Sequence, residues 1–289
     1  MKKINLIYWN DNNNFGDLLS PFIVEKLSGK KTTHKDLYNL RKLHFNDILH
    51  AIWSWEFLRI RTNLFFWQKN LMAIGSILRW GNNRTKIWGS GFLYETDSFN
   101  GGKIYALRGE YSNNKLKEMG YKGCKIFGDP ALLLPMIVPC NNKPKKILGI
   151  IPHWQDLSSM PPPNKNYDII DLKTTNIIDK INEITSYQYI LSTSLHGIIV
   201  AHAYGIPAIW IQQNKIDGDG IKFKDYFSSV NIPIYEGFKN YNDILKSQES
   251  IITFFEQNKK RTLPQVNISS IQKKLIEVAP FHILPQYKK

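Results

Sequence analysis

The residues best suited to chemistry lie in one short stretch, 191–197, where His196 stands among small hydroxyl residues. An apolar strand is predicted over 187–191, and a helix is predicted to start directly behind the histidine. That helix stops at Gly205-Ile206-Pro207, before a second apolar strand over 208–211. Open α/β sheets bind ligands at the carboxyl ends of their strands, and helix N-termini favour anions there. The stretch therefore predicts half of an anion-handling active site.

Two further groups are predicted to end strands near this site. His153 follows a predicted strand over 147–151, and in a doubly wound unit it would project into the same crevice as His196. Histidine can donate or take a proton near neutral pH. Near the start of the chain, Asn14-Phe15-Gly16-Asp17 forms a turn in which Gly16 permits a backbone conformation closed to other residues. Asp17 either caps the following helix or lies in the cleft and accepts a proton from an acceptor hydroxyl.

Arg108 closes a predicted strand over 104–107 and is followed by Gly109. In that position its guanidinium is expected to point between two halves of the protein, where it can pair with phosphate or carboxylate through two hydrogen bonds. The alternative is a surface arginine that pairs with Glu110 or Glu118.

Other polar residues are predicted to be structural. Asp129 is expected to cap a turn before Pro130, and His202 to pack inside the helix that follows His196. The pair Asp217-Gly218-Asp219 is similar to the carboxylate pairs with which glycosyltransferases bind divalent metals, but its basic surroundings disfavour that interpretation, and no metal site is predicted. The two cysteines, Cys124 and Cys140, are too few for a disulfide framework and indicate a reducing compartment.

Composition predicts packed cores and anionic partners. The chain has 289 residues, 43% of them hydrophobic, which is enough for one large or two medium domains. A net charge of +14 fits nucleic acid, an anionic membrane surface or phosphorylated substrates. Because no nucleic-acid module is recognisable, nucleic acid is not expected as a partner, and phosphate or peripheral membrane contact is favoured.

No apolar run is long enough for a bilayer span or a signal-peptide core, so a cytoplasmic location is expected, with the inner face of the membrane as a second possibility. Aromatic and arginine residues crowd 53–67. They either bury a helix pair against the first sheet or lie at a membrane interface.

Strand and helix signals alternate along the chain, which predicts an α/β fold with parallel sheets. Strands are expected in the first half at 4–8, 71–75, 86–88, 104–107 and 125–127, with helices at 18–27 and 113–119. Proline-rich residues 135–144 are the predicted linker. Strands follow at 147–151, 167–172, 187–191 and 208–211, with closing helices at 242–245, 250–257 and 270–278. We predict two Rossmann-like domains, 1–139 on the acceptor side and 143–289 on the donor side, facing one another across a cleft.

A series of short motifs occurs in one order over about residues 5–230. They are Asn14-Phe15-Gly16-Asp17-Leu18-Leu19-Ser20-Pro21, Ile74-Gly75-Ser76-Ile77-Leu78, Trp88-Gly89-Ser90-Gly91-Phe92, Tyr105-Ala106-Leu107-Arg108-Gly109, Gly128-Asp129-Pro130-Ala131-Leu132-Leu133, Pro152-His153, Ser194-Leu195-His196-Gly197 with Gly205-Ile206-Pro207, and Lys224-Asp225-Tyr226-Phe227. In this order the chain resembles the polysaccharide pyruvyl transferase family, especially the ketal-pyruvate transferases of bacterial exopolysaccharide loci.

The resemblance implies a GT-B-like fold and phosphoenolpyruvate as donor substrate, with no further cofactor. Pyruvate would be carried to two hydroxyls of one sugar as a cyclic ketal, on a glycan or lipid-linked oligosaccharide of exopolysaccharide or capsule biosynthesis. Many relatives have arginine just before the Leu-His pair, where this chain has Ser194. Donor binding therefore falls more heavily on Arg108 or on Lys222 and Lys224.

The chemistry suggests a role for each group. Phosphoenolpyruvate carries a phosphate and a carboxylate, so its site needs cations and backbone donors. His196 is the expected acid that protonates the methylene carbon, His153 would serve the phosphate, and Asp17 the acceptor hydroxyl. The expected substrate-binding residues are Arg108, Ser194, Leu195, Gly16, Asn14, Ser76, Lys222 and Lys224.

Two other functions compete. A GT-B glycosyltransferase that uses a nucleotide sugar would usually place a glutamate five residues before the glycine of Gly-x-Pro, to hold the ribose. That position is Val200, which cannot form the hydrogen bond. A membrane-associated scaffold protein would need neither His196 nor Arg108.

Overall fold

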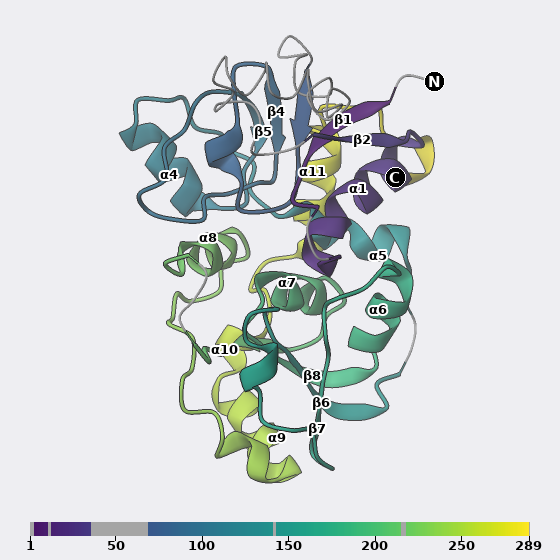
Figure 1. Ribbon diagram of the computed structural model, residues 1–289, viewed down its shortest axis with the longest axis vertical. Coiled ribbons are helices and arrows are strands. Elements are labelled where there is room, and N and C mark those ends of the chain that lie inside the picture. The colour runs from purple at the N-terminus through teal and green to yellow at the C-terminus, as the bar shows by residue number, and fades with distance from the viewer. Residues whose placement is uncertain (1–2, 11–12, 36–68, 141–142, 215–217, 289) are drawn as a thin grey trace, which may run out of the picture.

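The computed structural model describes residues 3–10, 13–35, 69–140, 143–214 and 218–288 (Figure 1). The aromatic segment at 53–67 and Asp217 lie outside the described residues, so the expectations for them stay predictions.

The chain folds into two parallel β-sheets with helices packed against them, as the alternating pattern predicts (Figure 1). The first sheet has the order β2-β1-β3-β4-β5 and the second the order β7-β6-β8-β9. The strands are β1 (Ile4–Ile7), β2 (Thr32–Lys35), β3 (Asn70–Met72), β4 (Thr85–Trp88), β5 (Lys103–Ala106), β6 (Lys146–Ile151), β7 (Tyr167–Ile169), β8 (Tyr187–Ser192) and β9 (Ala208–Trp210). In each sheet the first crossover runs to one side of the starting strand and the later ones run to the other side. This change of side, or reversal point, lies between β1 and β3 in the first sheet and between β6 and β8 in the second. Each reversal opens a ligand crevice at the carboxyl ends of the strands.

Helices alternate with these strands. The α-helices are α1 (Phe15–Ser28), α4 (Glu110–Glu118), α5 (Leu134–Ile137), α6 (Ile177–Ile184), α7 (Leu195–Ala203), α8 (Ile221–Ser229), α9 (Gln248–Gln257), α10 (Lys259–Thr262) and α11 (Ile268–Glu277). Short 3₁₀ turns occur at η1 (Leu78–Trp80), η2 (Pro130–Leu133), η3 (Leu157–Ser159), η4 (Ile244–Lys246) and η5 (Pro285–Tyr287). Helix α1 ends at Gly29, whose left-handed backbone lets its N–H bond the carbonyl of Glu25.

Two expectations of secondary structure are wrong, and several elements were not predicted. Residues 125–127 form no strand, because only Phe127 bridges to Leu107 beyond the edge of the first sheet. The helix expected at 242–245 is the single turn η4. Strand β2 and helices α5, α6, α8 and α10 had no predicted counterpart. Helix α6 is capped at its N-terminus by Asn176, whose side chain accepts hydrogen bonds from the N–H groups of Ile178 and Asp179.

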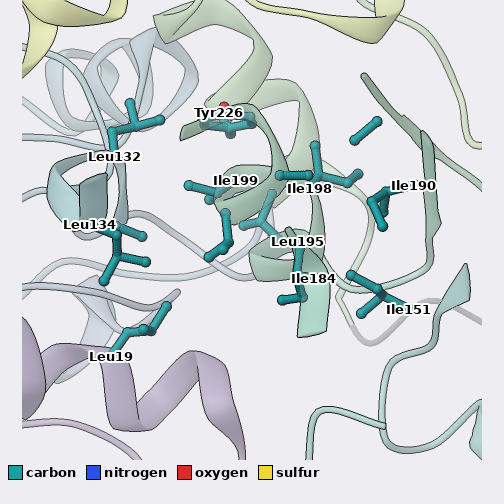
Figure 2. Packing of buried hydrophobic residues seen from close by; sticks show 14 of the residues in the cluster. Leu19, Leu132, Leu134, Ile151, Ile184, Ile190, Leu195, Ile198, Ile199 and Tyr226 are labelled. Atoms are coloured by element: carbon teal, nitrogen blue, oxygen red, sulfur yellow. The ribbon is translucent and has the colours of Figure 1, made fainter. Parts of the chain in front are cut away.

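Helix α7, which carries His196, lies at the centre of the hydrophobic core. Its Leu195, Ile198 and Ile199 are buried among side chains from several elements (Figure 2). The labelled neighbours are Leu19, Leu132, Leu134, Ile151, Ile184, Ile190 and Tyr226. One continuous cluster of buried residues joins both sheets through this helix. Since burial of each such side chain stabilises the fold by about 1.5–3 kcal/mol, α7 is held firmly in place.

The C-terminal segment returns to the first sheet. The indole N–H of Trp88 in β4 donates to the carbonyl of Leu275 in α11 at 2.9 Å. The ammonium of Lys86 donates to the carbonyl of Pro280 at 2.8 Å, and Leu284 N–H donates to Leu27 at 2.8 Å. Helices α11 and α1 both contact η2. The domain boundary between residues 139 and 143 stays a prediction. Helix α11, expected as a closing helix of the second domain, packs against the first sheet.

Among the described residues, no helix is both long and apolar enough to cross a membrane.

Candidate active site

A cavity of about 270 Å³ lies where the carboxyl ends of the two sheets meet. Its walls come from the segments after β1, β3, β4, β6 and β8 and from α8. Four of these strands, β1, β3, β6 and β8, lie at the two reversal points. The lining residues are Trp9, Asn14, Asp17, Gly75, Ser76, Leu93, His153, Trp154, Ser194, Leu195, His196 and Lys222. Strand ends from both sheets therefore contribute to one site, and the expectation that His153 and His196 face the same crevice is confirmed.

The turn after β1 brings Asn14 and Asp17 to the cavity. Asn14 is the N-cap residue of α1, and its side-chain amide donates to the Asp17 carboxylate at 2.8 Å. The turn is tied to the loop after β7, because Phe15 N–H donates to the carbonyl of Leu172 at 2.9 Å. Of the two alternatives for Asp17, the structure places its side chain at the cavity and does not use it as the helix cap.

Two hydroxyls of the turn after β8 are structural. Ser192 Oγ donates to the carbonyl of Ile151 and accepts from the N–H of Ser194. Thr193 Oγ1 accepts from the N–H of His153 at 2.7 Å, which locks the ends of β6 and β8 together. Of the three hydroxyl residues in the turn, only Ser194 lines the cavity, at the N-cap of α7. The N–H groups that open a helix have no partner within it, so this end of α7 can bind an anion.

Positive groups surround His196. Burial is the main cause that lowers the pKa of His196 from 6.5 to about 3, and the positive charges of Arg108, Lys222 and His153 lower it further. Without a bound ligand the imidazole is therefore neutral near pH 7. Lys222 is buried and lines the cavity, with its ammonium 5.6 Å from the ring centre of Phe223. A cavity that penalises a further positive charge favours an anion.

Arg108 lies between the two halves, but its guanidinium is engaged by the protein. Its Nε donates to Asp225 of α8 at 3.1 Å, one terminal nitrogen donates to Ser76 Oγ at 2.6 Å, and the other to the carbonyl of Phe92 at 2.8 Å. The residue is completely buried and does not line the cavity. The alternative of a surface arginine that pairs with Glu110 or Glu118 is wrong, and Ser76, which accepts from Arg108, is the residue of this group that lines the cavity.

Lys224 also differs from the expectation. Although it lies on α8 only two residues after Lys222, it does not line the cavity, and its ammonium pairs with Glu236 at 2.7 Å. The two carboxylate oxygens of Asp219 accept hydrogen bonds from the N–H groups of Ile221 and Glu95. No three His, Cys, Asp or Glu side chains gather as a metal-binding group in the part of the chain that the structure describes.

Asp129 has a second feature that the sequence did not predict. As expected, one carboxylate oxygen caps η2 by accepting from Ala131 N–H at 2.9 Å. The other oxygen, Oδ2, lies 3.9 Å from Nε2 of His196. His202 packs in the core as predicted, with Nδ1 3.0 Å from the hydroxyl of Tyr226. Many aspartates cap turns in this way. Only the position of Asp129 beside His196 in the folded chain distinguishes it from them.

Comparison with known proteins decides the family. A family model described as polysaccharide pyruvyl transferase matches residues 3–214. This chain belongs to that family. The match covers β1 to β9 and every lining residue of the cavity except Lys222. Membership makes the chain a transferase of pyruvyl groups to polysaccharide.

The chain is also similar to a viral protein over nearly the whole length of both. It is 28% identical over 294 residues to the uncharacterized protein L143 of Acanthamoeba polyphaga mimivirus. The aligned region covers 94% of this chain and 93% of that protein. No solved structure matches the chain.

The fit between α1 and His196 gives a first prediction for this pyruvyl transferase. A Cβ added at Gly16 would overlap Nδ1 of the His196 ring. We expect Gly16→Ala to displace the ring and to lower turnover by about 10²-fold, because a displacement of about 1 Å is that costly for a group with the catalytic role expected of His196. The measurement is a double-mutant cycle with His196→Ala. An equal loss in the His196→Ala background would contradict this explanation.

Proposed function

We propose that the protein transfers pyruvate from phosphoenolpyruvate to two hydroxyls of one sugar in a polysaccharide or lipid-linked repeat unit, which forms a cyclic ketal. The observation that carries this proposal is the cavity itself. Two helix N-termini and the side chains of Lys222 and His153 face it, and a neutral imidazole stands beside them. A small trianionic donor matches that charge pattern.

In this proposal the donor lies against the second sheet. Lys222, His153 and the N–H groups at the start of α7 bind its phosphate and carboxylate. Ser76 Oγ accepts a hydrogen bond from Arg108, so its own proton is free to be donated into the cavity. Arg108 thereby acts through Ser76. It takes the place of a direct contact that many relatives make with arginine at the position of Ser194.

The reaction then proceeds in two additions. His196 donates a proton to the methylene carbon, and the electrons of the double bond form the new C–H bond. The cationic carbon is attacked by the first sugar hydroxyl, whose proton passes to Asp17. The C–O bond to phosphate breaks and inorganic phosphate leaves. The second hydroxyl attacks the same carbon and gives its proton to the imidazole of His196, which closes the ketal and restores the acid, while the proton held by Asp17 passes to the departing phosphate. A positioned acid contributes about 10²–10⁴-fold to such a step.

The acceptor sugar is proposed to stack on Trp154. This residue follows His153, lines the cavity and is 56% exposed, while Trp9 lines the cavity from the first sheet. Exposed indole rings bind the apolar faces of ligands and keep a polar edge in water. The side-chain amide of Asn14 and the carboxylate of Asp17 can then hydrogen-bond sugar hydroxyls.

We expect Trp154→Ala to raise the KM for the acceptor about tenfold, which corresponds to a lost contact of about 1.4 kcal/mol. The KM for phosphoenolpyruvate should not change, and Trp154→Phe should keep most of the acceptor affinity. Steady-state kinetics with each substrate varied in turn make the test. An equal rise in the KM for both substrates would contradict a stacking role.

The test of the proposed function uses the purified chain with phosphoenolpyruvate and a pool of lipid-linked oligosaccharides. Mass spectrometry should find oligosaccharides heavier by one pyruvic acid less one water, with release of inorganic phosphate. In a thermal-shift series, phosphoenolpyruvate should stabilise the protein and UDP-glucose should not. Stabilisation by UDP-glucose alone would favour the glycosyltransferase instead. On α7, Val200 is completely buried and apolar, so it offers no hydrogen bond to a ribose.

A further inference from the structure

Two buried polar atoms without hydrogen-bond partners face one another beneath the cavity. Within the described residues, four buried side-chain nitrogen or oxygen atoms lack a partner, and they include Asp129 Oδ2 and His196 Nε2. These two atoms are 3.9 Å apart. Buried polar groups are nearly always satisfied, so a facing pair of unsatisfied atoms of complementary type requires an explanation. A small rotation of either side chain would join them.

The surrounding elements hold this carboxyl group in one orientation. Asp129 is completely buried, and its Oδ1 accepts the N–H of Ala131 at the start of η2. Because Oδ1 is used in this way, Oδ2 is the oxygen left to face α7. On the opposite side of the imidazole, Nδ1 lies against Gly16 at the N-terminus of α1. The ring therefore has one nitrogen toward a buried carboxyl group and the other toward the segment that forms the cavity wall.

We propose that Asp129 is a positioning residue for His196: it accepts the Nε2–H, directs Nδ1 toward the donor, and stabilises the imidazolium that forms when the donor anion binds. The proton enters at Nδ1 from solvent as the donor binds and leaves to the methylene carbon. Asp129 itself remains unprotonated during the transfer. This role rests on the proposed function for the reaction step, but the arrangement of the pair does not.

The electrostatics of the free protein explain why the charged Asp129–His196 pair does not form until a ligand binds. Burial raises the pKa of Asp129 from 3.8 to about 6, and the nearby charge of Asp225 adds to this increase. The hydrogen bond from Ala131 N–H and the positive charge of Arg108 act in the opposite direction. Both members of the pair are thus disfavoured in their charged forms. The groups that face them are Arg108, Lys222, His153, Asp225, Tyr226 and, across the cavity, Asp17. A bound trianion offsets the positive charge of Arg108 and Lys222 and makes the imidazolium favourable.

The first test needs no substrate. In Asp129→Asn, Oδ1 still accepts from Ala131, so the amide N–H₂ faces Nε2 and forces that nitrogen to accept. Nitrogen NMR of labelled histidine at mildly alkaline pH should show Nε2–H in the wild-type ring of His196 and Nδ1–H in the variant. His196→Ala assigns the signal, and Asp168→Asn, an exposed carboxylate, is the control. The same tautomer in wild type and Asp129→Asn would overturn the proposal.

The second test uses phosphoenolpyruvate. Calorimetry in buffers of different ionisation heat should show proton uptake on binding to the wild type, and binding should tighten as pH falls, because the anion raises the pKa of His196. Asp129→Asn should bind with little proton uptake and lose about 10²-fold or more in kcat, with a shifted pH profile. Unchanged proton uptake and pH profile would overturn the proposal. Failure of the wild type to bind phosphoenolpyruvate would overturn the proposed function, while the NMR result still decides the pair.

Discussion

Replacement of His196 by alanine is expected to lower pyruvyl transfer by about 10²–10⁴-fold, because it removes the proton donor of the first step. The fold should survive, since Nε2 of this ring has no hydrogen-bond partner whose loss would leave another group unsatisfied. The matched control is His282→Ala, which removes an exposed histidine near the C-terminus. Near-normal turnover of His196→Ala with an acceptor would contradict the assigned role.

The same variant is expected to change how stability depends on pH. The pKa of His196 falls from 6.5 to about 3 on folding, chiefly through burial. As pH drops through that interval the unfolded chain takes up a proton at this position and the folded chain does not, so the free energy of unfolding falls. His196→Ala should therefore lose less stability on acidification than the wild type, as measured by Tm against pH. His202, whose pKa is lowered to about 4, contributes with the same sign in both proteins.

The second large effect concerns the buried ion pair between Arg108 and Asp225. We expect Asp225→Ala to lower the free energy of unfolding by about 3–5 kcal/mol, because it leaves the Arg108 guanidinium buried without a counter-charge. Both side chains are at most 1% exposed, and Asp225 also accepts from the N–H and the hydroxyl of Ser112 in α4. Urea denaturation provides the measurement.

The chain offers a matched control for this prediction. Lys146 and Asp168 form an ion pair at 2.9 Å whose side chains are 53% and 43% exposed. Exposed pairs contribute only about 0–1 kcal/mol, so Asp168→Ala should change stability little. A similarly small change for Asp225→Ala would show that the pair does not hold α8 against the first half. Arg108→Ala should also lower turnover, because Ser76 loses its fixed orientation.

Local patterns were sufficient to predict much of the site. Apolar runs that end in small polar turns located the strand ends, and since parallel strands end at one edge, His153 and His196 could be placed in one crevice. The same reasoning brought Asn14 to the cavity. Helix signals also located α1, because its apolar spacing ends at Gly29.

Contacts between distant segments could not be predicted in this way. Arg108 and Asp225 are 117 positions apart, and nothing local to either residue indicates the other. Helix α8 gave no clear signal because it packs with a mixed pattern of buried lysine, aromatic and acid side chains. Because the sequence near Asp129 contains no sign of His196, it predicted only a turn cap. Its position under His196 follows from the packing of η2 against α7, which is a property of the whole core.

The most direct test is a crystal structure of the protein with phosphoenolpyruvate. We expect the donor in the cavity between the two sheets, with its phosphate or carboxylate at Lys222 and the start of α7, and with its methylene carbon next to His196. Ser76 should donate to the ligand while Arg108 keeps its pair with Asp225. Phosphoenolpyruvate bound elsewhere, with the imidazole of His196 out of reach of its methylene carbon, would contradict the mechanism.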